Sequence, residues 1–374
     1  MKRIAHVFLV IMILFIVSAC NRRDSGTVAF ERGAVDFDAT QLPRMRIAFG
    51  YGDWESLLGM QFTAAFRYLS EAFNFELVTF NSGSGEDAVA YVESLLAGGN
   101  IDGIVAVTWG TATQVVADRH GVPVVVACSF PSAQEIASVA AFDTFLGGVI
   151  DDEVWAGYNA MRALYNAGSR NVTWSGLTIG MSQSHDDRTR GARQFIAENP
   201  GMNLITESFT RGTWHDDVRT FAAVFPEMNG MAFTALSDAV YHAMSVEGIA
   251  SGSVKIAGPD VSSGTGDMFR RGIQVWSCGG QYATAMVSFA ILYNYLIDGT
   301  RIIPNTAIPI SRNYLEISSY EDFQEYEEVV NSPIPLYSAQ DIAQMIHFFN
   351  PSLSFDDFVR EGREFSLSTI LARR

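Results

Sequence analysis

The sequence predicts an α/β protein with two doubly wound parallel-sheet lobes. Strand-like and helix-like patterns alternate from Met45 onward, which is typical of parallel sheets covered by helices. Continuous apolar runs at 101–108 and 122–127 indicate strands that are buried on both faces. The alternation restarts after a strand-like run at 142–150, so the 374 residues divide into two sets of strand–helix units.

The first set begins with a strand at 45–50. Phe62, Phe66 and Leu69 repeat at helical spacing and predict a helix over 57–73. The elements expected after it are a strand at 75–80, a helix at 86–97, the strand at 101–108, a helix at 112–120 and the strand at 122–127.

The second set opens with a helix in which Val154, Tyr158 and Met161 form one apolar stripe, and Gly168 is a suitable C-cap. The strands expected after it lie at 171–181, 202–209, 230–235, 254–257 and 272–278. The helices between and after them start at Thr189 and span 216–225, 238–247 and 283–297. Short extended pieces follow at 308–310 and 314–317.

The N-terminus has the pattern of an export signal. Lys2 and Arg3 precede an apolar run at 7–17, which is too short to span a membrane comfortably. Small residues then precede Cys20, a pattern that resembles the lipobox of bacterial lipoproteins. The resemblance implies that residues 1–19 are a signal peptide, that Cys20 is lipidated and that 20–44 form a tether. An ordinary signal peptide or a membrane anchor is the alternative.

Composition excludes several other classes of protein. The net charge of −16 gives no positive surface for nucleic acid.

Cys128 and Cys278 are expected to be two lone buried cysteines, although an oxidising compartment would also permit a disulfide between them. Neither a metal-ligand spacing nor a hydrolase or phosphate-binding motif is present, so we expect no cofactor and no enzyme activity. The acidic tail at 318–374, rich in Phe and Tyr, is expected to be helical with a solvated charged face.

Four local patterns lie in a fixed order between residues 45 and 315. They are an acidic residue, helix and glycine-ended turn at 152–168, an Arg-x-x-Gly at 188–191, a strand ending in Ser-Asp-Ala at 237–239, and Gly-Pro-Asp at 258–260 followed by a Gly-Gln turn and a long helix. Their order resembles the type I periplasmic binding proteins of the ribose/galactose-binding, lac-repressor-core-like group.

The resemblance implies two lobes joined by three crossover segments, near 142–146, 279–282 and 306–312. Residues 45–142 and 281–308 are then lobe 1, and residues 143–280 and 309–317 are lobe 2. A small polar ligand is expected in the cleft, where the lobes close on it by hinge motion.

The resemblance places the ligand-binding arginine at Arg188, the strand-end aspartate at Asp260 and the hinge glutamine at Gln281. It also implies an aromatic wall at Trp214 and a polar contact at Ser237. Sugars offer hydroxyl groups around apolar C–H faces, so such a site needs fixed polar groups and flat aromatic walls. The further candidates from the loops after strands are Tyr51, Asp53, Trp54, Trp109 and Asp238.

Each candidate also has a purely structural interpretation. Arg188 can pair with Asp186 or Asp187 at the surface, and Asp238 can cap a helix. Trp109 and Trp214 can be packing residues within the lobes. Trp174 and Trp276 lie inside strands and are expected in the core, and His185 is expected to be exposed to solvent.

The function expected first is an exported, lipid-anchored solute-binding protein of the bacterial cell envelope. It would deliver a small polar ligand, such as a sugar, to an ABC importer. The alternatives are a sensor that presents ligand to a membrane receptor, a nucleoside- or purine-binding relative, and a structural protein whose acidic tail fills the cleft.

Overall fold

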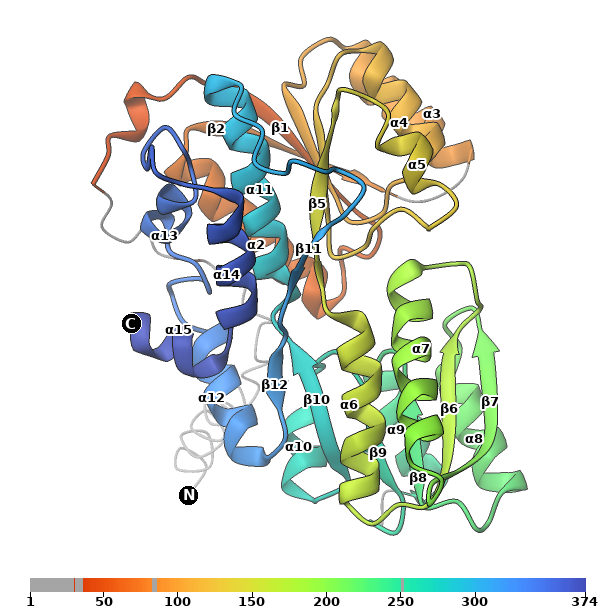
Figure 1. The fold of residues 1–374 in the computed structure, drawn as a ribbon. Helices are drawn as coiled ribbons and strands as arrows, with labels where there is room; N and C mark the ends of the chain where they lie inside the picture. Colours follow the sequence, from red (N-terminus) through yellow and green to blue (C-terminus); the bar gives the residue numbers. More distant parts are fainter. Residues whose placement is uncertain (1–29, 31–35, 83–85, 250–251) are drawn as a thin grey trace, which may run out of the picture.

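The computed structural model describes residues 30, 36–82, 86–249 and 252–374 as two lobes, one above the other (Figure 1). Each lobe contains a six-stranded sheet with a hydrophobic cluster on either side of it. The predicted α/β class with two doubly wound lobes is therefore confirmed. The predicted signal peptide at 1–19 and the lipidation residue Cys20 lie outside the described residues. No described helix has the length and apolar character that a membrane crossing requires.

The sheet of lobe 1 is wholly parallel, in the order β11-β5-β4-β3-β1-β2. Its strands are β1 (Met45–Tyr51), β2 (Phe75–Asn81), β3 (Gly103–Ala106), β4 (Val124–Ala127), β5 (Phe145–Asp151) and β11 (Ile310–Arg312). Its helices are α2 (Leu57–Ala72), α3 (Glu86–Ala97), α4 (Thr111–Arg119), α5 (Ile136–Val139) and α11 (Gln281–Asp298). Every residue of β3 and β4 is buried, as expected for strands covered on both faces.

The sheet of lobe 2 has the order β12-β10-β9-β8-β6-β7, and only β12 runs antiparallel to its neighbour among the described strands. Its strands are β6 (Asn171–Leu177), β7 (Asn203–Thr210), β8 (Gly230–Phe233), β9 (Lys255–Ala257), β10 (Gln274–Gly279) and β12 (Leu315–Ile317). Its helices are α6 (Glu153–Asn166), α7 (Gln183–Glu198), α8 (Trp214–Val224), α9 (Asp238–Val246) and α10 (Thr265–Arg270).

Two lobe boundaries differ from those expected. β5 pairs with β4, so 143–151 belongs to lobe 1, and the first crossover falls at Asp151–Asp152 instead of near 142–146. β11 pairs with β5 and β12 pairs with β10, so the third crossover falls at Asn313–Tyr314 instead of near 306–312. The strand patterns were recognised, but the neighbour of an edge strand is decided by tertiary pairing, which a local pattern does not reveal. The second crossover lies at Gly280, between β10 and α11.

The end of the predicted tether packs on lobe 1. The ring of Phe30 lies 6.0 Å from that of Tyr68. The ring of Phe37 stacks 5.3 Å from Phe73 and 4.6 Å from Phe349. The described part of 20–44 is therefore docked, in contrast to the linker that its mixed polar composition predicted.

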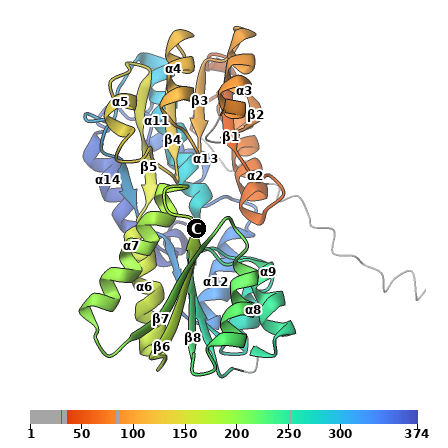
Figure 2. The ribbon, with the colours of Figure 1, turned by 90° about the vertical axis from the view of Figure 1, so that its right-hand side faces the viewer.

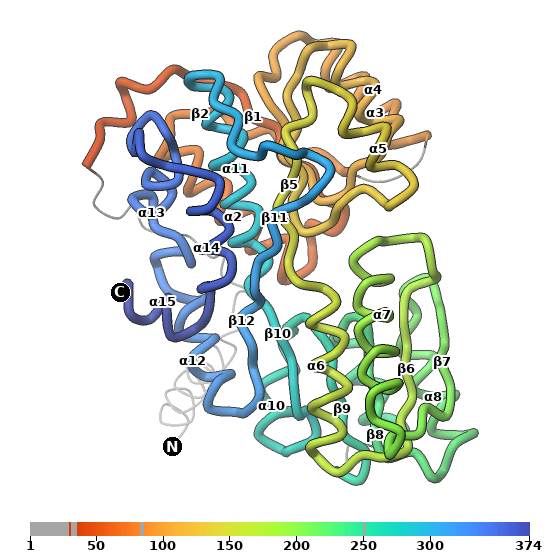
Figure 3. Tube along the Cα trace, viewed as in Figure 1, coloured from red at the N-terminus to blue at the C-terminus, as the bar shows by residue number. Residues whose placement is uncertain are grey.

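The C-terminal extension comprises α12 (Tyr320–Val330), α13 (Ala339–Gln344), α14 (Phe355–Glu364) and α15 (Leu367–Arg373). Figure 3 shows it along one side of both lobes. α13 packs on α11 in lobe 1, whereas α12 packs on α10 and β12 in lobe 2. The extension is helical as predicted, but it also buries Phe323, Tyr326 and Tyr337, so it is an integral part of the core.

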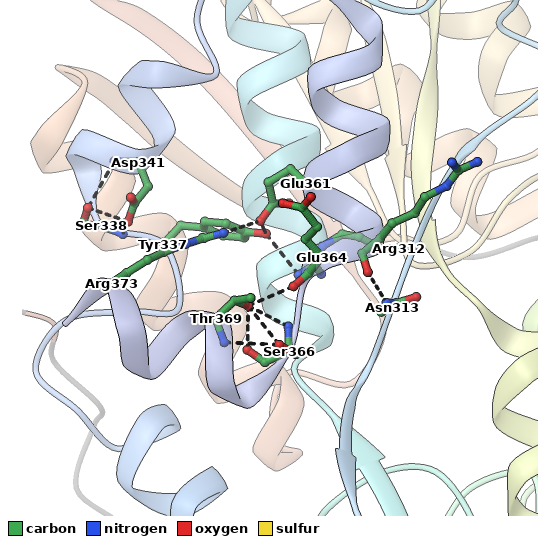
Figure 4. A network of polar contacts seen from close by, with 11 residues as sticks. Arg312, Asn313, Tyr337, Ser338, Asp341, Glu361, Glu364, Ser366, Thr369 and Arg373 are labelled. Carbon is green, nitrogen blue, oxygen red and sulfur yellow. Dashed lines mark hydrogen bonds and ion pairs between the residues drawn. The ribbon is translucent and has the colours of Figure 1, made fainter.

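The extension also encloses the third crossover. Arg312 is fully buried there and belongs to a network of polar contacts with the extension (Figure 4). Its guanidinium carbon lies 3.6 Å from the centre of the Phe365 ring. Its Nη1 donates to Thr284 Oγ1 of α11 at 2.6 Å, and its Nη2 donates to the Tyr337 hydroxyl at 3.3 Å. Tyr337 in turn donates to Glu361 at 2.5 Å. The crossover is thus held between lobe 1 and the extension.

Candidate ligand site

The carboxyl ends of the two sheets face each other across the lobe boundary. β5 runs toward this boundary, and α6 leaves it for the far end of lobe 2, so β6 returns toward it (Figures 1 and 2). Ligands of open α/β sheets bind at the carboxyl ends of the strands. A hydrogen bond crosses the boundary here, from Ser184 Oγ to the carbonyl oxygen of Cys128 at 3.1 Å. We call the region bounded by Tyr51, His185, Trp214, Asp260 and Gln281 the central site.

Asp260 lies where the central site meets the second crossover. Its φ of +75° is in the left-handed region, which aspartate tolerates better than most residues. The backbone is fixed by a bond from Asp260 N to the Cys278 carbonyl at 3.0 Å and by Ser277 Oγ, which donates to the Asp260 carbonyl at 2.8 Å. Gln281 Nε2 donates to Asp260 Oδ1 at 2.5 Å. Two of the predicted site residues, Asp260 and Gln281, are therefore in direct contact.

The carboxylate of Asp260 keeps access to the interlobe space, because 29% of its side chain is exposed. Its Oδ2 lies 3.7 Å from Arg188 Nη1, which is too long for a hydrogen bond. Burial raises the pKa of Asp260, while Arg188 and Gln281 act in the opposite direction. Oδ2 is thus an acceptor suited to a ligand hydroxyl.

Arg188 is buried beneath Asp260 and uses all three guanidinium nitrogens within the protein. Nε and Nη2 donate to the two oxygens of Glu153 at 2.5 and 3.2 Å. Nη1 donates to the carbonyl of Thr234 at 2.6 Å, and Nη2 also donates to the Tyr314 hydroxyl at 2.9 Å. The alternative that Arg188 pairs with Asp186 or Asp187 at the surface is wrong. The structure indicates that Arg188 is a buried residue that supports Asp260.

Glu153 and Tyr314 are the residues of this network that the sequence did not reveal. The Tyr314 hydroxyl donates to Glu153 Oε2 at 2.8 Å, and both side chains are buried. Burial raises the pKa of Glu153 to about 7, and Arg188 and Tyr314 oppose this rise. The available signal was an acidic residue in the first turn of α6, immediately after the crossover from lobe 1.

Trp214 and His185 form an aromatic pair on the lobe 2 side. Their rings are stacked, with centroids 6.0 Å apart and an interplanar angle of 14°. His185 was expected to be exposed, but it is partly buried against Trp214. Burial lowers the pKa of His185 to about 3, with a further contribution from Arg188. The imidazole is therefore neutral at physiological pH and has one donor and one acceptor nitrogen.

The loop after β1 contributes the lobe 1 side. The rings of Tyr51 and Trp54 meet edge to face at 5.7 Å, and both are partly buried. Trp54 Nε1 donates to Asn81 Oδ1 at 2.8 Å, which fixes the indole. Burial raises the pKa of Tyr51 to about 12, so its hydroxyl keeps its proton. Asp53 is exposed, and its backbone carbonyl holds Ser56.

Three other predicted residues contribute less directly to the central site. Trp109 is only 5% exposed, packs in the lobe 1 core and donates from Nε1 to Gln114 at 2.8 Å, so its packing interpretation holds. Asp238 accepts from Ser263 Oγ at 2.8 Å and from the backbone of Gly264, so it fixes the loop after β9 and does not cap a helix. Ser237 is the N-cap residue of α9, but its side chain makes no capping hydrogen bond.

The buried polar atoms without a hydrogen-bond partner among the described residues include four that lie just after a strand or in the first turn of the helix that follows it. They are His185 Nδ1, Trp214 Nε1, Thr234 Oγ1 and Ser82 Oγ. Three come from lobe 2, and Ser82, whose backbone N–H donates to the Tyr51 carbonyl at 3.2 Å, comes from lobe 1. Buried polar groups are normally satisfied, so a group of open donors and acceptors at strand ends indicates a place for a ligand.

The described residues contain no group of ligands suited to a metal ion.

Cys128 and Cys278 are both buried free thiols. Desolvation raises the pKa of both thiols, so they remain protonated at neutral pH.

No family model matches the sequence, and no curated protein matches it. Solved structures match over nearly their whole length. A periplasmic sugar-binding protein from Pseudomonas fluorescens has a TM-score of 0.69 at 12% identity, covering 87% of this chain and 99% of that one. A galactofuranose binding protein has a TM-score of 0.65 at 16% identity, covering 77% and 99% of the two chains.

The binding component of the arabinose ABC transporter from Shewanella sp. ANA-3, bound to arabinofuranose, has a TM-score of 0.64. Its identity is 17%, and the match covers 76% of this chain and 95% of that one. The chain therefore has the type I periplasmic binding protein fold, as the sequence patterns implied.

Proposed function

We propose that this protein captures a sugar in the central site and presents it to an ABC importer. The observation that carries the proposal is the set of unpartnered polar atoms near strand ends, which includes Nε1 of Trp214 and Nδ1 of His185, the two stacked rings on the lobe 2 side. A sugar supplies hydroxyl groups for such atoms and a C–H face for an indole. Asp260 Oδ2 is the charged acceptor, and Gln281 fixes its orientation.

The chemistry of the structural neighbours agrees with this ligand class. The three matched proteins are a periplasmic sugar-binding protein, a galactofuranose binding protein and the binding component of an arabinose transporter bound to arabinofuranose. At 12–17% identity, these likenesses establish the fold. The proposal for this chain therefore depends on its own site residues.

We also propose that the protein is exported and anchored to the envelope membrane by lipid on Cys20. The support is the short apolar leader and the small residues before the cysteine. Metabolic labelling with a radioactive fatty acid tests this directly. Label should enter the wild-type protein and be absent from Cys20→Ser, and equal labelling of both would contradict the anchor.

Thermal melting of the protein against monosaccharides, nucleosides and amino acids tests the ligand class. A ligand that binds only the folded state adds about 2.7 kcal/mol of stability at a hundredfold excess over Kd. We expect a clear rise in Tm with one or more sugars. A rise with adenosine that galactose cannot compete away would instead establish a nucleoside-binding protein.

A further inference from the structure

A cavity of about 240 Å³ lies between the lobes beside the central site. Lobe 1 lines it with apolar groups that include Phe130, Pro131 and Ile136. Lobe 2 lines it with polar side chains from the first two turns of α7, which include Gln183, Asp187 and Arg190. One wall therefore suits C–H surfaces, and the opposite wall suits hydroxyl groups.

The polar wall contains a preformed set of donors and acceptors. Asp187 Oδ1 accepts from Gln183 Nε2 at 2.8 Å and from Arg190 Nη1 at 2.9 Å. The side chain of Asp187 is 15% exposed, whereas that of Arg190 is 63% exposed and can reorient. Carboxylate, guanidinium and amide groups beside an aromatic ring, here Phe130, are the same chemical set that surrounds Asp260 in the central site.

The cavity and the central site share the start of α7 and the residue beneath it. Ser184 lines the cavity, while the next residue, His185, stacks on Trp214. Glu153 also lines the cavity, and its carboxylate holds Arg188. The cavity and the central site are therefore neighbours along the start of α7.

The size of the cavity suits part of a ligand. Its volume of about 240 Å³ can hold a group the size of one sugar ring. Complete small-molecule sites usually enclose about 300 Å³ or more. The cavity is thus too small for a typical independent site and large enough for one additional ring.

We propose that this cavity is a second sugar subsite, so that the preferred ligand is a disaccharide with one ring in the central site and the other between Phe130 and Asp187. This inference rests on the proposed sugar-binding function. It adds a specificity for linked sugars that the central site alone does not provide.

Isothermal titration calorimetry of the full-length protein in detergent tests the subsite. The probes are galactose and arabinose, each beside its own disaccharide, galactobiose and arabinobiose. For the sugar that binds, we expect the disaccharide Kd to be lower than that of the monosaccharide by about tenfold or more. Phe130→Ala and Arg190→Ala should remove this advantage and leave monosaccharide affinity unchanged.

The two variants, Phe130→Ala and Arg190→Ala, are both checked for correct folding by circular dichroism. Because the Arg190 side chain is largely exposed, Arg190→Ala should fold normally. Equal Kd values for a monosaccharide and its disaccharide, or loss of both affinities together in the variants, would overturn the subsite while leaving sugar binding intact. Absence of binding by all four probes would contradict the proposed function and the subsite with it.

Discussion

The guanidinium of Arg188 donates two hydrogen bonds to the carboxylate of Glu153, from Nε to Oε2 at 2.5 Å and from Nη2 to Oε1 at 3.2 Å. Both side chains are almost completely buried, at 7% and 4% exposed. The arginine that the sequence singled out for ligand binding is thus the buried support of Asp260. Its replacement tests folding more directly than it tests recognition.

Arg188→Ala should lower the free energy of unfolding by about 3–5 kcal/mol, because it removes one partner of a buried ion pair and leaves Glu153 without the two hydrogen bonds that Arg188 donates. Urea denaturation measures this change. Arg190→Ala is the matched control on the same helix, and its exposed side chain predicts a change within about 0.5 kcal/mol. Equal stability of Arg188→Ala and the wild type would show that the buried pair is not formed.

Trp214 and Trp109 should respond in opposite ways. Trp214→Ala removes the exposed wall of the central site and should weaken binding of the identified sugar by about tenfold. Trp109→Ala empties part of the lobe 1 core and should cost about 3–5 kcal/mol of stability. Trp109→Phe fills most of that space and should retain the wild-type Kd. Calorimetry and urea denaturation on the three variants separate recognition from packing.

Glu153 should make stability depend on pH. Its pKa is raised to about 7 in the folded protein, above its value of about 4.3 in the unfolded chain, so the folded state holds a proton that the unfolded chain releases. Protonation therefore favours folding, and this contribution is lost as pH rises through about 7.

Urea denaturation of the wild type and Glu153→Gln at pH 5 and pH 8 measures this contribution. The wild-type free energy of unfolding should fall by roughly 2–3 kcal/mol relative to the variant over this range. His185 is present in both proteins, so its own titration cancels in the comparison. Parallel pH profiles would contradict a raised pKa at Glu153.

Gly362 of α14 tests whether the extension packs on the third crossover. A Cβ at this position would lie 2.9 Å from the carbonyl oxygen of Ser311 and 3.1 Å from Arg312 Cγ. Gly362→Ala should therefore lower the free energy of unfolding by about 1–3 kcal/mol.

The control for Gly362 is Gly98→Ala, because the nearest atom to a Cβ there is the Leu95 carbonyl oxygen at 3.7 Å. It should change the free energy of unfolding by less than about 0.5 kcal/mol. A destabilisation of Gly362→Ala no larger than that of Gly98→Ala would show that α14 does not contact β11 closely.

Local sequence patterns were sufficient to predict most of the fold. Continuous apolar runs identified β3 and β4, and Trp174 and Trp276 inside strands are 0% and 1% exposed, as expected for core residues. The lobe that contains β5 or β11 was not predictable in this way, because the pairing of edge strands depends on distant segments. The extension was recognised as helical, but its charged composition concealed the apolar face that packs on both lobes.

The resemblance named Asp260 and Gln281 as separate candidates for the site, and the structure brings them into contact. Glu153 was not identified as the partner of Arg188, because the two residues are 35 positions apart and only tertiary structure unites them. Trp109 and Trp214 both follow strands, and only the structure shows that Trp109 is buried in the lobe 1 core whereas Trp214 is partly exposed and stacks on His185.

The central claim is that Asp260 is a direct ligand contact in a sugar site. The most direct measurement is the Kd of the best sugar, by titration calorimetry, for the wild type and for Asp260→Asn. Asparagine also tolerates the left-handed backbone at this position, so the variant should fold with an unchanged Tm. We expect a loss of affinity of about ten- to a hundredfold, because a hydrogen bond to a charged group contributes roughly 1.5–3 kcal/mol. An unchanged Kd would show that the sugar binds without Asp260 and would contradict the proposed site.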